Sequence, residues 1–66
     1  MTVYVNGHAQ NIPPNQSIAT LIESLDVPSD RVAVELNRSI VRKRDWQQTS
    51  VPDGSQIEIV EFVGGG

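Results

Sequence analysis

Only one segment of this chain repeats its apolar residues at helical spacing, and strand-like segments lie on both sides of it. The i, i+3, i+4, i+7 pattern, which gathers apolar side chains on one helix face, is carried by Ile18, Leu21, Ile22 and Leu25. Ser17 is suited to cap the start of this helix, and Pro28 is expected to stop it. With a single helix available, the core must form between that helix and one face of a single sheet.

Alternating apolar and polar residues predict the strands of this sheet. The first two, residues 2–5 and 8–12, are separated by Asn6-Gly7, two residues that tolerate positive φ and favour a tight hairpin. Further strands are expected at residues 32–36, 39–41 and 56–63, with turns at 37–38 and 52–54. Residues 42–48 fit a polar connection or a short helical turn. The predicted class is α+β, a two-layer sandwich of four to five strands on one main helix within one domain, residues 1–66.

The predicted core uses most of the aliphatic residues, each contributing roughly 1.5–3 kcal/mol if fully buried. Few apolar side chains then remain to line an internal ligand pocket, so function is expected on the surface or at the chain end. The predicted core residues are Val3, Val5, Ile12, Ile18, Leu21, Ile22, Leu25, Val32, Val34, Leu36, Ile57 and Ile59.

Composition excludes several classes of function. The absence of cysteine removes disulfides, thiolate metal sites and a cysteine nucleophile. A net charge of -3 has the wrong sign for nucleic-acid binding, and no apolar run is long enough to span a membrane. A chain of 66 residues is also too small for a deep catalytic cleft. We expect a cytoplasmic protein, unprocessed at its N-terminus, without a catalytic, cofactor or metal site of its own.

The sequence ends with Gly64-Gly65-Gly66, directly after the apolar strand and without a polar linker. Glycine lacks a Cβ, so such a segment fits a slot too narrow for other residues. The predicted tail, residues 63–66, would be flexible and would place the Gly66 carboxylate, the expected reactive group, in another protein's active site. A frayed terminus or an expression scar is the alternative interpretation of the glycines alone.

A second candidate site is an apolar surface beside the tail. If the helix covers Ile57 and Ile59, strand alternation places Val60 and Phe62 on the opposite, uncovered face. These residues predict a partner-docking patch, and Tyr4 is a further candidate if the first strand lies alongside the last. A bulge that turns Phe62 inward is the alternative.

Three other features are interpreted structurally. His8, the only histidine, is expected to be a solvated turn residue. The basic run, residues 42–44, is expected to be a solvated connection, although it could orient an acidic partner surface. Trp46 is expected to pack its ring against the sheet edge.

Lys43 is the only lysine. A single lysine argues weakly against a protein modifier that forms polymers by linking its C-terminus to lysines of further copies.

These elements and motifs resemble the ubiquitin-like β-grasp fold, with one mixed sheet and a projecting C-terminal glycine tail, and in particular the ThiS family of sulfur carriers for thiamine thiazole synthesis. The chain departs from the family at Arg42, where members often have proline, and in Gly64, the extra glycine before the last two, which occurs in some members only. The residues that carry the resemblance are Val32-Ala33-Val34, Asn37, Ile40-Val41, Trp46, Asp53-Gly54, Ile57-Glu58-Ile59-Val60 and Phe62-Val63-Gly64-Gly65-Gly66.

The resemblance implies a carrier and cosubstrate that is not itself an enzyme. A ThiF-type adenylating enzyme would use ATP to activate the Gly66 carboxylate, and sulfur from a cysteine desulfurase or another donor would displace AMP to give a thiocarboxylate. A ThiG-type thiazole synthase would be the recipient. Residues Val63, Gly64, Gly65 and Gly66 would enter the partners' active sites. A molybdopterin-type carrier, a ubiquitin-like protein modifier and a noncovalent adaptor are the alternatives.

Overall fold

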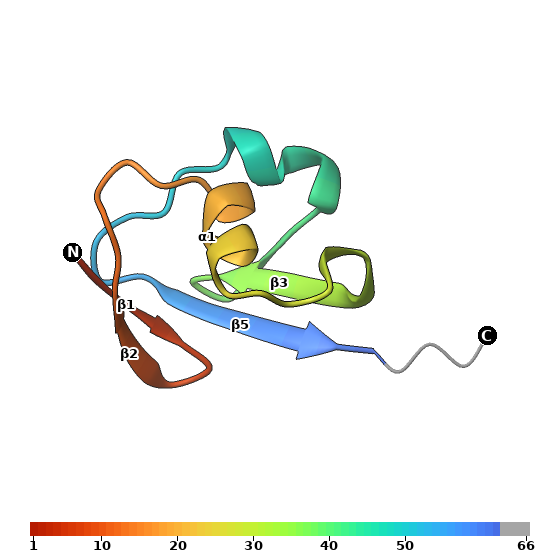
Figure 1. The fold of residues 1–66 in the computed structure, drawn as a ribbon, viewed down its shortest axis with the longest axis horizontal. Coiled ribbons are helices and arrows are strands. Elements are labelled where there is room, and N and C mark those ends of the chain that lie inside the picture. Colours follow the sequence, from red (N-terminus) through yellow and green to blue (C-terminus); the bar gives the residue numbers. More distant parts are fainter. Residues whose placement is uncertain (63–66) are drawn as a thin grey trace.

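The computed structural model describes residues 1–62, and these form one mixed sheet with a helical layer on one side (Figure 1). The strand order is β2-β1-β5-β3-β4. The β1–β5 pair is parallel, whereas β1–β2, β3–β4 and β3–β5 are antiparallel. This arrangement confirms the predicted α+β class. The strands are β1 (Thr2–Val5), β2 (His8–Asn11), β3 (Val32–Leu36), β4 (Ser39–Val41) and β5 (Gln56–Glu61).

The helix α1 (Ile18–Ser24) begins where the sequence predicts and ends earlier. The Ser17 side chain accepts a hydrogen bond from the Thr20 backbone N–H at 3.1 Å, which is the expected N-cap. The stop assigned to Pro28 is wrong, because Asp26 already leaves the helix with a left-handed φ of 57°. Aspartate tolerates this conformation better than most residues, so it serves as the terminator.

Both predicted hairpins turn through residues with positive φ. Asn6 and Gly7 have φ of 50° and 82°, and Asn37 and Arg38 have φ of 50° and 74°. Two consecutive residues with positive φ match the twist of the strands they connect. Residues 42–48, predicted to be a polar connection or a short helical turn, contain the 3₁₀ helix η2 (Lys43–Gln48), which confirms the helical alternative. A shorter 3₁₀ turn, η1 (Ser29–Arg31), precedes β3.

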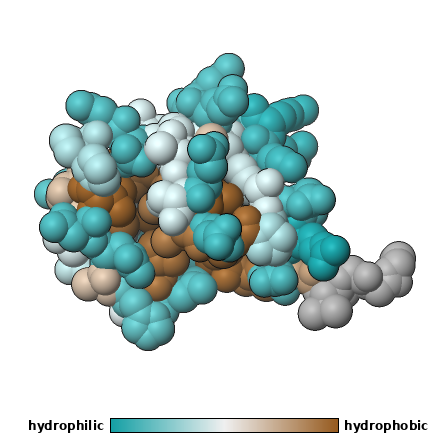
Figure 2. All heavy atoms as spheres, in the orientation of Figure 1, coloured by the Kyte–Doolittle hydropathy of each residue, from teal (hydrophilic) through white to brown (hydrophobic). Residues whose placement is uncertain are grey.

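The core lies between α1, η2 and one sheet face, where Figure 2 shows hydrophobic side chains gathered beneath hydrophilic ones. The structure confirms eight predicted core residues, Val3, Val5, Ile18, Leu21, Ile22, Val32, Val34 and Ile57. It adds Trp46 and Val51, which the periodic patterns did not include. The other four predicted core residues are only partly buried, at the margin of the core: Ile12, Leu25, Leu36 and Ile59.

Two strand ends also differ from the prediction. β2 ends at Asn11, so Ile12 follows the strand, where its backbone N–H still donates to the Met1 carbonyl at 2.8 Å. β5 ends at Glu61, two residues before the predicted end. The predicted tail, residues 63–66, lies outside the described residues, and so does its predicted projection from the fold.

Candidate functional site

The strand that leads to the glycine segment is the middle strand of the sheet. β5 lies between β1 and β3, so hydrogen bonds hold it from both sides. Its pairing with β1 covers only Gln56 and Ile57, whereas its pairing with β3 continues to Glu61, opposite Val32. The second half of β5 therefore extends past β1 while β3 still supports it.

The two turn asparagines hold β5 with their side chains as well as forming turns. The Asn6 amide accepts from the Ile59 N–H at 2.8 Å and donates to the Ile59 carbonyl at 3.2 Å. The Asn37 side-chain oxygen accepts from the Gln56 N–H at 2.9 Å, while its backbone N–H donates to the Gln56 carbonyl at 2.7 Å. Asn6 thus satisfies backbone groups at the point where β1 no longer pairs with β5.

Backbone pairing continues one residue past the end of β5. The Phe62 N–H donates to the Arg31 carbonyl at 2.8 Å, which extends the ladder between β5 and the chain before β3. The backbone is therefore fixed up to the residue that precedes Val63. Gly66, the predicted reactive residue, and the predicted tail residues Val63, Gly64 and Gly65 lie outside the described residues.

The predicted docking residues share the sheet face that the helix does not cover. Tyr4, Val60 and Phe62 are 41%, 60% and 51% exposed. Tyr4 alternates with buried residues along β1, Val60 follows the partly buried Ile59 along β5, and Phe62 lies one residue past the end of β5. The alternative in which a bulge turns Phe62 inward is wrong, because half of its side chain remains in contact with solvent. The predicted docking role itself is not tested by these exposures.

The structure adds Ile40, 74% exposed, to this uncovered face. Its place follows from the two-residue turn at Asn37-Arg38, which pairs Leu36 with Ser39 and Glu35 with Ile40. The sequence carried this signal, because a two-residue hairpin loop fixes which residues lie opposite each other. We refer to Tyr4, Ile40, Val60 and Phe62 as the open-face patch.

The remaining candidates lie elsewhere. His8 is exposed, as predicted, but it is the first residue of β2 rather than part of the turn. The predicted position of Trp46 at the sheet edge is only partly right, because its ring is buried in the core. The indole N–H does reach the edge strand β4, where it donates to the Val41 carbonyl at 3.0 Å. The basic run, residues 42–44, is exposed, as predicted.

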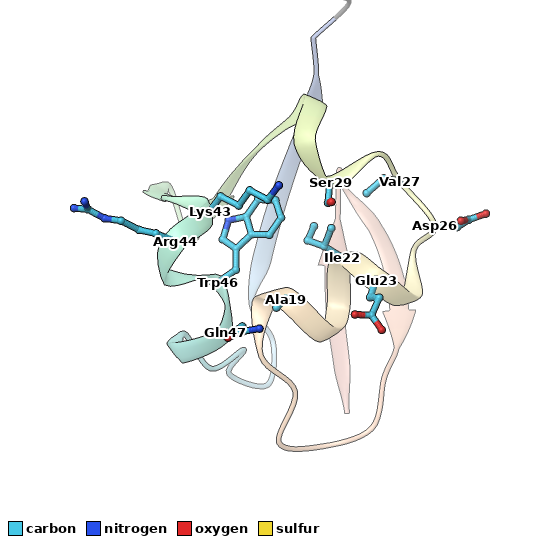
Figure 3. Close-up of a pocket in the computed structure, with 10 residues that line it drawn as sticks. All are labelled: Ala19, Ile22, Glu23, Asp26, Val27, Ser29, Lys43, Arg44, Trp46 and Gln47. Carbon is cyan, nitrogen blue, oxygen red and sulfur yellow. The ribbon is translucent and has the colours of Figure 1, made fainter.

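A groove of about 750 Å³ lies on the helical side of the molecule (Figure 3). Glu23 and Asp26 line it from the α1 side, Lys43 and Arg44 from the η2 side, and Trp46 lies between them. It is an open surface groove rather than an internal pocket, and it belongs to the face opposite the open-face patch.

In residues 1–62 no three His, Asp or Glu side chains come together as a metal-binding group. Within the same range no helix is long and apolar enough to cross a membrane.

Comparison with known proteins connects this arrangement to a family. The family model described as the ThiS family matches residues 3–66. The chain belongs to the ThiS family. The Escherichia coli sulfur carrier protein ThiS is 32% identical over 66 residues, which cover all of both chains. The Bacillus subtilis sulfur carrier protein ThiS is 38% identical over 50 residues, or 76% of each chain.

Another relative carries the ThiS-like sequence within a much longer chain. A thiazole synthase of Paramagnetospirillum magneticum is 41% identical over all 66 residues of this chain, which correspond to 20% of that protein. This chain therefore spans about a fifth of the length of that relative.

The fold comparison agrees with the family assignment. The crystal structure of the thiamine biosynthesis protein ThiS from Geobacter metallireducens superimposes with a TM-score of 0.88 at 30% identity, covering all of both chains. The sheet order and single main helix thus confirm the predicted ThiS-type β-grasp fold.

Proposed function

We propose that this ThiS-family chain is a sulfur carrier for thiamine thiazole synthesis, with the Gly66 carboxylate as the group that is modified. The observation that carries the proposal is the support of β5, whose backbone is fixed up to Phe62, four residues before Gly66. Glycines from 64 onward fit a narrow enzyme channel, while the folded part supplies the docking surface.

The proposed chemistry needs activation by a partner. A carboxylate is a poor electrophile, so a ThiF-type enzyme would transfer AMP from ATP to the Gly66 carboxylate and release pyrophosphate. A sulfide equivalent, supplied by a cysteine desulfurase or another donor, would then attack the acyl carbon. AMP would leave with one of the former carboxylate oxygens, and a thiocarboxylate would remain. ATP would be bound by the partner, and this chain would serve as cosubstrate rather than catalyst.

The recipient in this proposal is a ThiG-type thiazole synthase. The thiazole synthase of Paramagnetospirillum magneticum supports this link, because part of that chain is similar to all of this one. Docking would use Tyr4, Val60 and Phe62, whose exposed side chains lie on the uncovered face of the sheet. The expected location, where these enzymes would meet the carrier, is the cytoplasm.

The direct test is the intact mass of the chain after incubation with ATP, a cysteine-derived sulfur source and an extract of its own cells. We expect an ATP-dependent gain equal to the replacement of one oxygen by sulfur, localised to Gly66. A ladder of larger conjugates, each formed with loss of water, would instead indicate a protein modifier. An unchanged mass in an extract shown to be active would favour a noncovalent adaptor.

Transfer to a recipient separates the two kinds of sulfur carrier. The thiocarboxylated chain is given to thiazole synthase in one reaction and to molybdopterin synthase in another, and the return of the original mass is followed. We expect sulfur loss only with thiazole synthase and its other substrates. Loss only with the molybdopterin enzyme would assign the chain to that variant.

Removal of Gly65 and Gly66 tests whether the chain end carries the function. We expect the deletion to abolish the sulfur-dependent mass gain and to change the free energy of unfolding by no more than about 0.5 kcal/mol, as for a segment away from the core. Function that survives the deletion would support the adaptor.

A further inference from the structure

The open-face patch surrounds two carboxylates that lie directly opposite each other. Glu35 on β3 pairs with Glu58 on β5, and alternation places both side chains on the face opposite buried Val34 and Ile57. Like charges directly opposite each other on neighbouring strands destabilise a sheet. This arrangement therefore works against the stability of the chain alone.

The positions directly opposite the pair, or next to it along β5, carry no basic residue. Across β4, Ile40 lies opposite Glu35. Along β5, the next residues on the same face are Gln56 and Val60. None of these three side chains is basic. The nearest basic residue on this face is Arg42, which follows β4 in an extended conformation and is diagonal to Glu35 rather than opposite it. The two carboxylates are thus opposed to each other without a basic residue directly opposite them or next to them along β5.

A hollow on the same face is suited to receive a cation. It measures about 240 Å³ and is lined by Tyr4, Gly7, Gln56, Ile57 and Glu58. Tyr4 is 41% exposed, and aromatic faces attract guanidinium and ammonium groups. Glu58 adds a carboxylate, which can accept two parallel hydrogen bonds from arginine. An aromatic ring and a carboxylate beside one hollow are complementary to a basic side chain.

We propose that the open-face patch docks an apolar partner surface that carries one arginine or lysine, and that this side chain enters the hollow between Tyr4 and Glu58, with Glu35 nearby. The proposal rests on the proposed function and commits to thiazole synthase as the partner. A wholly apolar partner would bury the two opposed carboxylates without adding an opposite charge, at a free-energy cost. A basic side chain offsets their repulsion, and the net negative charge of the chain also speeds its approach.

The test compares variants that each remove one negative charge. The dissociation constant for thiazole synthase of the same organism is measured at low and moderate salt for the wild-type chain and for Glu58→Gln, Glu35→Gln and Glu23→Gln. Glu23 is the matched control, because it is an exposed acid that lines the groove on the helical side. Glu58→Asp, which keeps the charge, tests whether charge alone restores binding.

We expect Glu58→Gln to weaken binding by about tenfold, the lower range for close charge pairs, and to flatten the salt dependence. Glu35→Gln should act in the same direction, Glu58→Asp should retain most of the affinity, and Glu23→Gln should change it less than twofold. In the free chain, Glu58→Gln should raise the Tm by about 2 °C, because it removes the cross-strand repulsion. A merely structural role would not give better folding together with weaker binding.

Two results would overturn the proposal. One is that Glu58→Gln and Glu35→Gln bind as tightly as Glu23→Gln, or more tightly, which would show that the patch takes a partner without a cation. The other is that wild-type chain does not bind thiazole synthase at all. If the chain still gains sulfur at Gly66 in that case, the carrier function stands and only the docking proposal fails.

Discussion

The two faces of one sheet have opposite roles in this molecule, although the same strands supply both. On the covered face, Val34 and Ile57 are almost completely buried against the helical layer. On the open face, their neighbours Glu35 and Glu58 oppose each other among exposed apolar side chains. The covered face meets the requirements of folding, whereas the open face keeps an arrangement that folding alone would not favour. The difference indicates where to look for function in a small domain.

The largest expected effect comes from a cavity on the covered side. Leu21→Ala removes a fully buried side chain, and we expect it to lower the free energy of unfolding by about 3 kcal/mol. Ile40→Ala, on the open face, should lower it by less than about 0.5 kcal/mol. Urea denaturation measures both values. Equal losses of unfolding free energy from the two substitutions would show that the covered and open sides do not differ in their contribution to stability.

An intermediate effect is expected at Asn6, which connects the first hairpin to β5. Asn6→Ala removes both hydrogen bonds to Ile59 and places alanine at a positive φ, so we expect a loss of about 2 kcal/mol. Asn6→Gly keeps the turn conformation and removes only the side-chain bonds, so its loss should be about 1 kcal/mol. Thermal unfolding of the two variants separates turn strain from support of β5. If Asn6→Gly leaves the free energy of unfolding unchanged, the side-chain hydrogen bonds of Asn6 do not stabilise β5.

A smaller effect is expected at the start of the helix that covers the sheet. Ser17→Ala removes the bond to the Thr20 N–H and should lower the free energy of unfolding by about 1 kcal/mol. Ser17→Asp restores a capping side chain and should recover most of this loss. Circular dichroism during urea titration follows both variants. A full loss in Ser17→Asp would show that the effect comes from some other contact of Ser17.

Local patterns in the sequence were enough to predict the covered side. The helical spacing around Leu21 and the Asn6-Gly7 turn each depend on residues close together in the chain, and both predictions were confirmed. Trp46 and Val51 were missed as core residues because they lie outside regular strands and the main helix, where no periodicity marks burial. The burial of Trp46 depends on how η2 packs against α1, and Val51 is held by a hydrogen bond from its N–H to the Gln16 carbonyl; both are tertiary contacts.

The candidate site was predictable only in part, for a related reason. Alternation along the predicted strand, residues 56–63, correctly predicted that Val60 and Phe62 are exposed. The opposition of Glu35 and Glu58 depends on the register between β3 and β5, which are joined by a long connection with no turn type to fix it. The two hydrogen bonds between the Asn6 side chain and the Ile59 backbone likewise join residues far apart in the chain. Such pairings become evident only once the sheet order is established.

The most direct test of the account substitutes one residue on the open face and measures folding and modification in the same preparation. For Phe62→Glu we predict a free energy of unfolding within about 0.5 kcal/mol of wild type, because Phe62 is half exposed at the end of the sheet. We also predict a marked fall in the rate at which Gly66 gains sulfur, followed by intact mass, because partner docking is lost. A large loss of stability would show that Phe62 belongs to the core. An unchanged rate of sulfur gain in a stable variant would contradict the assignment of function to the open face.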